Sequence, residues 1–375
     1  MPRKTKSEEK SIRYAVVGLG HIAQVAVLPG FNTARNTELA AIVSGDREKL
    51  TAVAQKYDIE QIFPYDEYDN ALSTVDAVFI ALPNHLHKEY VVRAANAGVH
   101  ILCEKPMAVT RADCEEMVEA SDRNHVKLMI AYRLHFEEAN LEAMRIACSG
   151  KLGDLRIFSS EFTQQVAPDN VRVTAPASEG GGSLYDMGVY CINAARYLFQ
   201  DDPTSVFGWS ANNGEERFRN VEEMVAVEMR FPKERLATFT CSFGAVDVSR
   251  YSLIGTEGKL VMEPAYDYSM ALKQELTIGE KTTKKTFRKR DQFAAELEYF
   301  SECILEDKEP EPSGLEGLAD VAIIEAIYES VRTGKPVEVS DLPEKPRPAP
   351  NQEIQRPAHG KPETVKTKSP SGEAA

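Results

Sequence analysis

Residues 12–23 of the chain read IRYAVVGLGHIA. Their first half is an almost continuous apolar run, as expected for a strand that is covered on both faces. The second half, Gly18-Leu19-Gly20-His21-Ile22-Ala23, matches the pattern G-x-G-x-x-G/A. Its glycines permit a tight turn and a close approach of the backbone to a pyrophosphate, and the next helix directs its N-terminus at that charge. The stretch therefore predicts dinucleotide binding rather than a plain structural turn.

The first third of the chain repeats this alternation of apolar runs and amphipathic segments. Repeated strand–helix units imply a parallel sheet with right-handed crossovers, so residues 12–134 are predicted to form a doubly wound, Rossmann-type domain. The expected strands are Ile12–Val17, Leu39–Val43, Ala77–Ala81, Val99–Cys103 and Leu128–Ala131, and the expected helices are roughly Glu48–Tyr57, Lys88–Ala97 and Arg111–Asn124.

The pattern changes after Leu134. A helix is expected to run to about Cys148, and a second, capped by Ser183, to about Phe199. Residues 135–340 are predicted to form an α+β domain with a large, open, mostly antiparallel mixed sheet, whose closing helices return toward the first domain. The expected strands are Leu155–Gln164, Val206–Ser210, Glu223–Phe231, Ala237–Ser242, Ser249–Ile254 and Lys259–Met262, and the closing helices are Gln292–Glu306 and Leu315–Thr333.

Length and charge narrow the class of protein. A chain of 375 residues suggests two domains, and a net charge of −14 disfavours nucleic acid and anionic membranes as partners. Residues 1–11, expected to be flexible, lack the apolar core of a signal peptide, and no later segment is apolar enough to span a bilayer. The chain is therefore expected to be cytoplasmic.

The cysteines and the C-terminal composition predict neither a metal site nor further folded structure. None of the six cysteines forms a C-x-x-C motif with another, so free thiols are expected rather than a zinc site. Residues 341–375 hold seven prolines and few large apolar side chains, and we predict that this tail is disordered.

The residues after the second strand bear on the choice between NAD and NADP. An acidic residue at that position favours NAD, because it accepts bonds from the ribose hydroxyls and repels a 2′-phosphate. Here Ser44 follows the strand, and Arg47 and Lys49 begin the next helix. A hydroxyl with two cations nearby favours NADP. Asp46 either faces the ribose or caps the helix, and we favour the cap.

Two later motifs lie at the carboxyl ends of predicted strands. Leu82-Pro83-Asn84-His85-Leu86-His87 follows the third strand, and we interpret it as a loop lining the cofactor crevice rather than a metal site. Glu104-Lys105-Pro106 follows the fourth, where the reactive end of the cofactor is expected. The same tripeptide at 344–346 falls in the tail, where no function is expected.

Asp186 and Tyr190 are four residues apart in a predicted helix and so share one face. A phenol accepts a proton only as phenolate, and a neighbouring ammonium such as Lys105 favours that form. From spacing alone, an ordinary helix surface explains the pair as well as a catalytic site does.

Seven segments together resemble the glucose–fructose oxidoreductase / inositol dehydrogenase / MocA family, and its glucose–fructose oxidoreductase branch most of all. They are YAVVGLGHIAQ, AIVSGDREK, ALPNHLH, ILCEKPMAV, LMIAYRLHFE, GGGSLYDMGVYCINAARYLF and AIYESVRTGKPV, between residues 14 and 337. The combination of E-K-P after a buried strand with D-x-G-x-H/Y is specific. Tyrosine at position 190, after GGGSL, is similar to that branch, whereas many members carry histidine there.

The resemblance implies a catalytic centre of Lys105, Asp186 and Tyr190, an NADP cofactor, and homodimers or homotetramers built through the open face of the second sheet. With the residues of the glycine turn and of the following helix start, the expected cofactor contacts are Gly18, Leu19, Gly20, His21, Ile22, Ser44, Arg47, Lys49, Tyr65, Leu82, Pro83, Asn84, His87, Glu104, Lys105, Tyr132 and Arg133.

The chemistry that we predict is NADP-dependent oxidation of an aldose at its anomeric carbon to a lactone, with reduction of a second sugar left open. Tyr190 would accept the hydroxyl proton, Lys105 would hold the phenolate, and Asp186 would orient the sugar or the phenol. The secreted glucose–fructose enzyme has a long N-terminal arm over its cofactor. About eleven residues precede the first strand here, so only partial cofactor retention is expected.

Two alternatives stay open. One is a dehydrogenase of inositol or another polyol, and the other is a non-catalytic sensor that binds dinucleotide and sugar without turnover. Fold does not choose among these functions. The intact Lys105, Asp186 and Tyr190 argue against the sensor.

Overall fold

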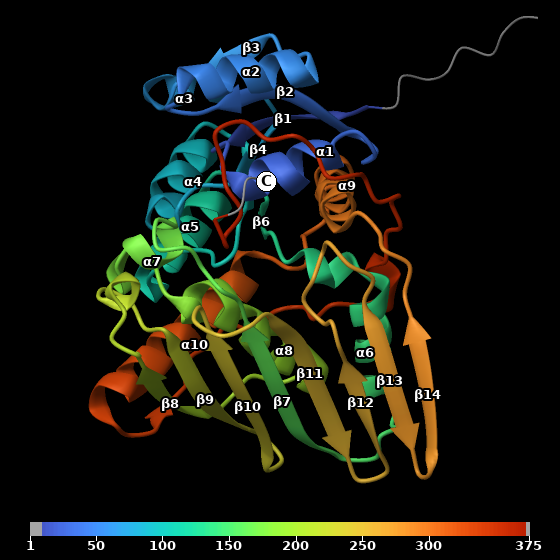
Figure 1. Cartoon of the computed structure of the whole chain (residues 1–375). Coiled ribbons are helices and arrows are strands. Elements are labelled where there is room, and N and C mark those ends of the chain that lie inside the picture. Colours follow the sequence, from blue (N-terminus) through green and yellow to red (C-terminus); the bar gives the residue numbers. More distant parts are fainter. Residues whose placement is uncertain (1–9, 373–375) are drawn as a thin grey trace, which may run out of the picture.

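Two sheets, one above the other in Figure 1, organise the computed structural model, which describes residues 10–372. The first nine residues of the N-terminal segment expected to be flexible lie outside the described residues. The described helices include none that is both long enough and apolar enough to cross a membrane.

The upper sheet, sheet A, has six parallel strands in the order β3-β2-β1-β4-β5-β6. This confirms the predicted doubly wound fold. Its direction of winding reverses between β1 and β4, so ligands are expected at the carboxyl ends of these two strands. The strands are β1 (Ile12–Val17), β2 (Thr37–Val43), β3 (Gln61–Phe63), β4 (Ala77–Ile80), β5 (His100–Cys103) and β6 (Leu128–Ile130).

Helices cover both faces of sheet A, which explains why β1 and β4 are apolar along their length. On one face lie α3 (Tyr68–Leu72), α4 (His87–Asn96) and α5 (Arg111–Arg123). On the other, a π-helical turn (Ala23–Val27) and α1 (Leu28–Gly30) pack with α9 (Gln292–Leu305), which contacts β1 and β2. A helix from late in the chain thus completes the first domain. The helix after β2 is α2 (Arg47–Tyr57).

The lower sheet, sheet B, has nine strands in the order β14-β13-β12-β11-β7-β10-β9-β8-β15, antiparallel except for β7 beside β10. This confirms the predicted large mixed sheet. The strands are β7 (Leu155–Thr163), β8 (Ser205–Ala211), β9 (Met224–Phe231), β10 (Arg235–Ser242), β11 (Val248–Gly255), β12 (Gly258–Met262), β13 (Lys273–Ile278), β14 (Lys281–Thr286) and β15 (Val337–Glu338).

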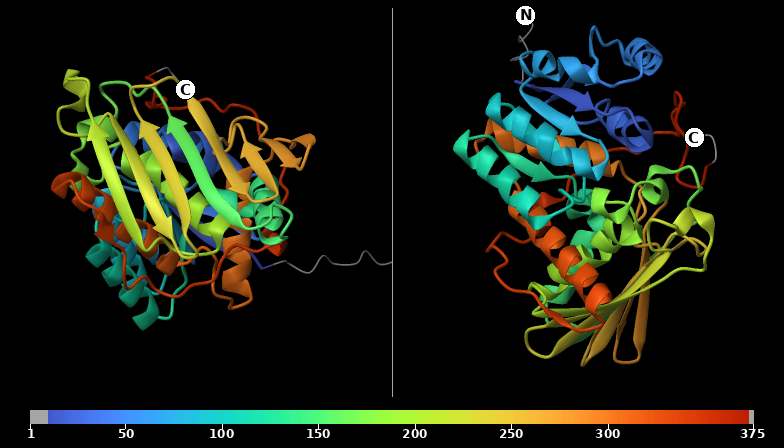
Figure 2. Two further views of the ribbon diagram at one scale, coloured as in Figure 1. Left: turned by 90° about the horizontal axis from the view of Figure 1, so that it is seen from below. Right: turned by 90° about the vertical axis from the view of Figure 1, so that its left-hand side faces the viewer.

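Helices cover only one face of sheet B, and the left view of Figure 2 looks onto the other. Along β9, buried and exposed residues alternate, as a strand covered on one side requires. The covering helices are α6 (Glu138–Cys148), α8 (Val189–Phe199) and α10 (Gly314–Thr333). Because α10 also packs against α5 and β6, it joins the two domains.

Local details differ from the sequence-based expectations. Ser183 does not cap a helix, since its hydroxyl donates to Glu222 at 3.3 Å and a π-helical turn (Leu184–Gly188) precedes α8. The expected single helix from Leu134 is a 3₁₀ turn followed by α6, whose cap is Glu137. Strands β3, β13, β14 and β15 were not predicted, because they are short or rich in lysine and threonine.

The C-terminal tail also differs from expectation, because residues 341–372 follow a defined path, drawn in red in Figures 1 and 2. Gln352 donates to the backbone carbonyl of Glu311 at 2.8 Å, and Arg356 donates from Nε to Glu298 at 2.6 Å. The tail is held by polar contacts with distant residues. Composition cannot reveal such partners, which is why a proline-rich, polar segment was predicted to be disordered.

Candidate active site

The glycine turn lies at the carboxyl end of β1, and its shape fits a dinucleotide. Gly18 has φ +95°, and a Cβ atom there would lie 2.4 Å from the carbonyl oxygen of Ala81. A Cβ on Gly20 would meet nothing within 4 Å, so the turn has open space above it. The chain then enters the π-helical turn, where the backbone N–H of Gln24 donates to the Gly20 carbonyl. Leu19, His21 and Ile22 belong to the same turn. A pyrophosphate fits this cradle.

The residues expected at the adenosine ribose gather at the carboxyl end of β2. The Asp46 carboxylate accepts a hydrogen bond from the backbone N–H of Lys49 at 3.0 Å and so caps α2. This confirms the predicted helix cap. Ser44 is buried beside Tyr65, whose ring packs against Gly45. Arg47 and Lys49 occupy the first turn of α2. The Ser44 hydroxyl and the Tyr65 ring therefore lie together after β2, and the first turn of the next helix carries two cations.

The loop after β4 joins the two domains along the crevice. Asn84 donates its side-chain amide to the carbonyl of Gly180 at 2.8 Å, while Leu82 and Pro83 precede it. His87 is fully buried and bonds to the carbonyls of Leu82, at 2.9 Å, and Pro106, at 3.1 Å. Its ring therefore links the loop after β4 to the loop after β5. Within residues 10–372, no group of three or more histidine, cysteine or acidic side chains could hold a metal.

Lys105 and Asp186, distant in sequence, meet at the carboxyl end of β5. The Lys105 ammonium donates to the Asp186 carbonyl oxygen at 2.9 Å and to its carboxylate at 3.1 Å. Arg172 donates to the other carboxylate oxygen at 2.6 Å. Burial opposes ionisation of Asp186, but the two cations hold its pKa down to about 2. The carboxylate is therefore charged and fixed in orientation at neutral pH.

Tyr190 completes this group, which we call the active-site cluster: Lys105, Arg172, Asp186 and Tyr190. The Lys105 Nζ atom lies 4.7 Å from the centre of the Tyr190 ring. Arg133 is buried and donates to the Tyr190 hydroxyl at 3.3 Å and to the Tyr266 carbonyl at 2.7 Å. Two cations thus lie beside one phenol, Lys105 over its ring and Arg133 at its hydroxyl.

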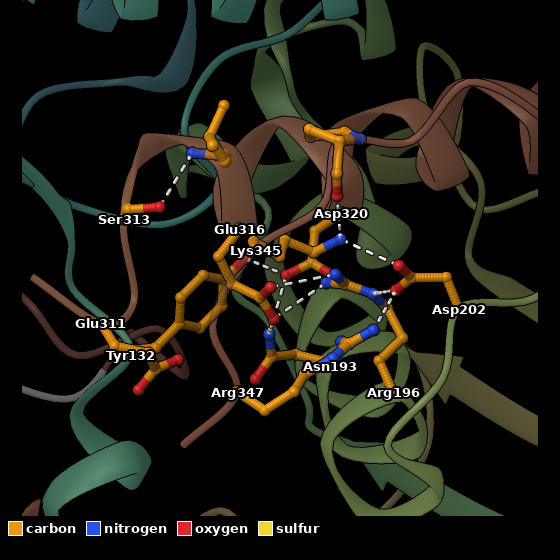
Figure 3. Close-up of polar contacts among 12 residues, drawn as sticks. Tyr132, Asn193, Arg196, Asp202, Glu311, Ser313, Glu316, Asp320, Lys345 and Arg347 are labelled. Atoms are coloured by element: carbon orange, nitrogen blue, oxygen red, sulfur yellow. Dashed lines mark hydrogen bonds and ion pairs between the residues drawn. The ribbon is translucent and has the colours of Figure 1, made fainter. Parts of the chain in front are cut away.

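Glu104 and Tyr132, two other expected cofactor contacts, lie beside the active-site cluster in different surroundings. Burial raises the pKa of Glu104, while Lys105 and Arg133 oppose that rise. The Tyr132 hydroxyl donates to Asp320 at 2.5 Å, inside a buried polar network drawn in Figure 3. That network includes Lys345, from the second copy of the E-K-P motif, which pairs with Asp202 at 2.9 Å. The second motif therefore has a structural role.

Sequence reasoning missed Arg172 and Tyr268. Arg172 lies in α7 (Val171–Thr174), within a polar loop that carries no recognisable pattern. Tyr268 lies in the turn-rich stretch before β13, and the Arg133 guanidinium lies 5.2 Å from its ring centre. Arg172 reaches Asp186 from a loop of the same domain, whereas Tyr268 of the second domain reaches Arg133 of the first. No local signal in the sequence could have identified them.

A cavity of about 450 Å³ adjoins the cluster through Tyr268. Its walls include His21 of the glycine turn, the N-terminus of α9 at Asp291 and tail residues 358–362. Lys105, Asp186 and Tyr190 do not line it. The cavity therefore lies between the glycine turn and the tail, beside the active-site cluster.

The class of protein follows from where the cluster lies. The carboxyl ends of β1, β4 and β5 share one edge of sheet A, so the cluster and the phosphate cradle face the same crevice. Nicotinamide-dependent oxidoreductases hold their cofactor at this position of the fold.

Comparison with known families agrees with this class. Residues 12–132 match the oxidoreductase family with an NAD-binding Rossmann fold, and residues 141–261 match the Gfo/Idh/MocA C-terminal domain. The chain belongs to the Gfo/Idh/MocA family of oxidoreductases, as the sequence motifs predicted.

Individual relatives share nearly the whole fold. D-xylose 1-dehydrogenase (NADP(+)) of Haloarcula marismortui is 36% identical over 337 residues, 87% of this chain and 92% of that protein. D-xylose 1-dehydrogenase (NADP(+)) 2 of Haloferax volcanii is 28% identical, covering 87% and 99%. The crystal structure of aldose-aldose oxidoreductase from Caulobacter crescentus, complexed with glycerol, has a TM-score of 0.84 and 35% identity. It is matched over its full length by 88% of this chain.

Proposed function

We propose that this protein is an NADP-dependent aldose oxidoreductase that oxidises the anomeric carbon of a sugar to a lactone. The observation that carries the proposal is the Lys105 ammonium, held by Asp186 beside the Tyr190 ring at the cofactor edge of sheet A. The relatives named for D-xylose and for aldoses support a sugar substrate.

Tyr190 is the proposed general base. The hydroxyl proton on the anomeric carbon passes to the Tyr190 oxygen as the C–H bond breaks with its electron pair and the C=O bond of the lactone forms. A bound NADP supplies the acceptor for that hydride. Lys105 lies over the Tyr190 ring and Arg133 donates to its hydroxyl, so both cations are positioned at the proposed base.

Asp186 and Arg172 are proposed to fix the geometry. An ammonium has three N–H groups, and Lys105 directs donors at the Asp186 carbonyl and carboxylate. With Arg172 on the second carboxylate oxygen, Asp186 cannot rotate without losing a charged hydrogen bond. Lys105 is thereby aimed at the space beside Tyr190, where the sugar hydroxyl must lie.

NADP is the proposed dinucleotide because the ribose end of the crevice carries Ser44, Arg47 and Lys49, while Asp46 is engaged as a helix cap. Both xylose dehydrogenases are named for NADP(+) as well. In the Lys49→Ala variant, we expect the ratio of NADP affinity to NAD affinity to fall.

The experiment that tests the function is a panel of aldoses and polyols with NADP and NAD, recording reduced nicotinamide and lactone. Turnover of aldoses such as xylose or glucose with NADP is the expected result. Turnover of myo-inositol alone would replace the proposal with a polyol dehydrogenase. Dinucleotide and sugar binding without turnover would replace it with a sensor. Lactone formed with no released NADPH, in the presence of a second sugar, would identify the two-sugar reaction.

The open face of sheet B is proposed as the surface for self-association. Ile157 and Leu236 are register partners on β7 and β10 and are 43% and 54% exposed, and Trp209 on β8 is 65% exposed. Exposed large apolar side chains on a sheet face that no helix covers favour a contact with a second copy of the chain. Light scattering at micromolar concentration should give a multiple of 41.6 kDa, and Leu236→Lys should shift it toward the monomer. A monomer in the parent protein would contradict this.

A further inference from the structure

The end of the tail runs from the first domain to the second, as its contacts show, and the right view of Figure 2 draws it in red beside both domains. On the first domain, Lys56 donates to the Glu363 carbonyl at 2.5 Å. There the Gln24 side chain also pairs with both backbone groups of Val365, at 2.7 and 3.0 Å. On the second domain, the Ala167 amide donates to the Pro370 carbonyl at 2.8 Å. Residues 363–370, which we call the strap, are thus attached at both ends.

Within the strap, Lys366 lies at the ribose end of the crevice. Its ammonium is 3.5 Å from the Asp46 carboxylate and forms an ion pair with Glu48. Asp46 donates its backbone N–H to the Ser44 hydroxyl at 3.4 Å, so the charge of this helix cap lies near the expected site of a 2′-phosphate. Lys366 is therefore a third cation beside Arg47 and Lys49, contributed by a segment more than 300 residues away in sequence.

We propose that the strap is part of the cofactor site and that Lys366 is a determinant of NADP specificity. This inference rests on the proposed NADP-dependent function. Lys366 acts in two ways: it offers an ammonium to the 2′-phosphate, and it neutralises Asp46 and Glu48, whose charges would otherwise oppose that phosphate. The ribose of NAD gains nothing from the first effect and little from the second, because it carries no charge there.

The strap also bears on cofactor release. A dinucleotide lying between the glycine turn and residues 363–370 leaves only after the strap detaches from Gln24 or from the second domain. Only partial retention was expected because the sequence offered no ordered covering segment. The strap is such a segment, so slow release of NADP follows from the inference.

The first test measures dinucleotide affinity by fluorescence titration of the full chain, without sugar. Lys366 has φ +50°, a conformation that asparagine adopts readily, so Lys366→Asn removes the charge with little change to the backbone. We expect NADP binding to weaken about tenfold and NAD binding to change less than about twofold. Adding Asp46→Asn, which keeps a helix cap, should restore part of the NADP affinity.

The matched control is Lys88→Gln. Lys88 also pairs with two carboxylates, Asp113 at 2.7 Å and Glu116 at 3.2 Å, and it is similarly exposed. Its loss should leave both affinities unchanged. Equal NADP affinity in the parent and in Lys366→Asn would overturn the inference and leave the proposed function intact. A parent protein that binds neither dinucleotide would overturn both.

A second measurement uses the unaltered protein. Trypsin cleaves after lysine, and Lys366 and Lys368 lie in the strap. If the strap closes over the cofactor, saturating NADP should slow cleavage at these sites several-fold, and saturating NAD should slow it less. Mass spectrometry of the C-terminal fragments gives both rates. Cleavage at the same rate with and without NADP would overturn the inference.

Discussion

Two buried groups of opposite charges, the network of Figure 3 and the active-site cluster, differ in how far their members are exposed. In the network of Figure 3, Arg196 is fully buried and pairs with Asp202, Glu316 and Asp320. Asn193 donates to Glu316 and Asp320 at 2.9 Å each. The charges of this network are matched by partners within the protein, and it joins α8 to α10.

The active-site cluster is built from the same kinds of groups but is left open. Lys105 and Asp186 keep 11% and 22% of their side chains exposed. Tyr190 is half-buried, and its hydroxyl receives a bond from Arg133 at 3.3 Å, the long end of the usual range. Buried charge alone therefore does not mark a functional site. What distinguishes the cluster is a half-buried phenol with one long hydrogen bond, with charged groups held in place around it.

The largest effect is expected from Tyr190→Phe, which removes only the hydroxyl that accepts one long bond from Arg133. Loss of a positioned acid–base group costs roughly a hundredfold to ten-thousandfold in turnover. Because the hydroxyl makes one long bond, thermal stability and NADP affinity should stay near those of the parent. Steady-state kinetics with the best aldose of the panel is the measurement. Turnover within about threefold of the parent would remove Tyr190 from the mechanism.

Arg196→Met, in contrast, should lower the stability of the fold. It leaves Glu316 and Asp320 buried without their cation, which typically costs about 3–5 kcal/mol in the free energy of unfolding. Denaturant unfolding measures the change. The control is Arg230→Met, an exposed residue paired with Glu234, for which about 1 kcal/mol or less is expected. A similar loss of unfolding free energy in both variants would mean that the buried network of Figure 3 stabilises the fold no more than an exposed ion pair does.

The smallest effect concerns pH. The pKa of Asp186 is lowered to about 2, whereas an unfolded aspartate titrates near roughly 3.9. A depressed folded pKa stabilises the protein above the unfolded value, and this contribution is lost as pH falls from about 4 toward 2. The stability difference between the parent and Asp186→Asn should therefore be constant above about pH 5 and shrink below pH 4. A difference that shrinks near neutral pH would contradict the low pKa.

Much of the fold was predictable because its signals are local. Apolar runs identified β1, β2 and β4, and G-x-G-x-x-A identified the turn, since each reflects the conformation and burial of neighbouring residues. The E-K-P motif and the spacing of Asp186 and Tyr190 identified residues that the structure brings together. Lys105 and Asp186 are 81 positions apart, and this separation hid the contact itself. Strands such as β14, made of exposed lysine and threonine, were missed because their pairing, not their composition, defines them.

By itself, the sequence determined the class of each domain, and it predicted the glycine turn and the side chains proposed to react. Only the tertiary structure decided that Arg172 faces Asp186, that Tyr132 and Lys345 join a buried network, and that Lys366 reaches Asp46. The physical reason is the range of the interactions. Backbone conformation and hydrophobic periodicity are written in consecutive residues, whereas ion pairs depend on distances set after the whole chain has packed. A polar tail looks disordered in sequence until the carboxylates that bind it are brought within reach.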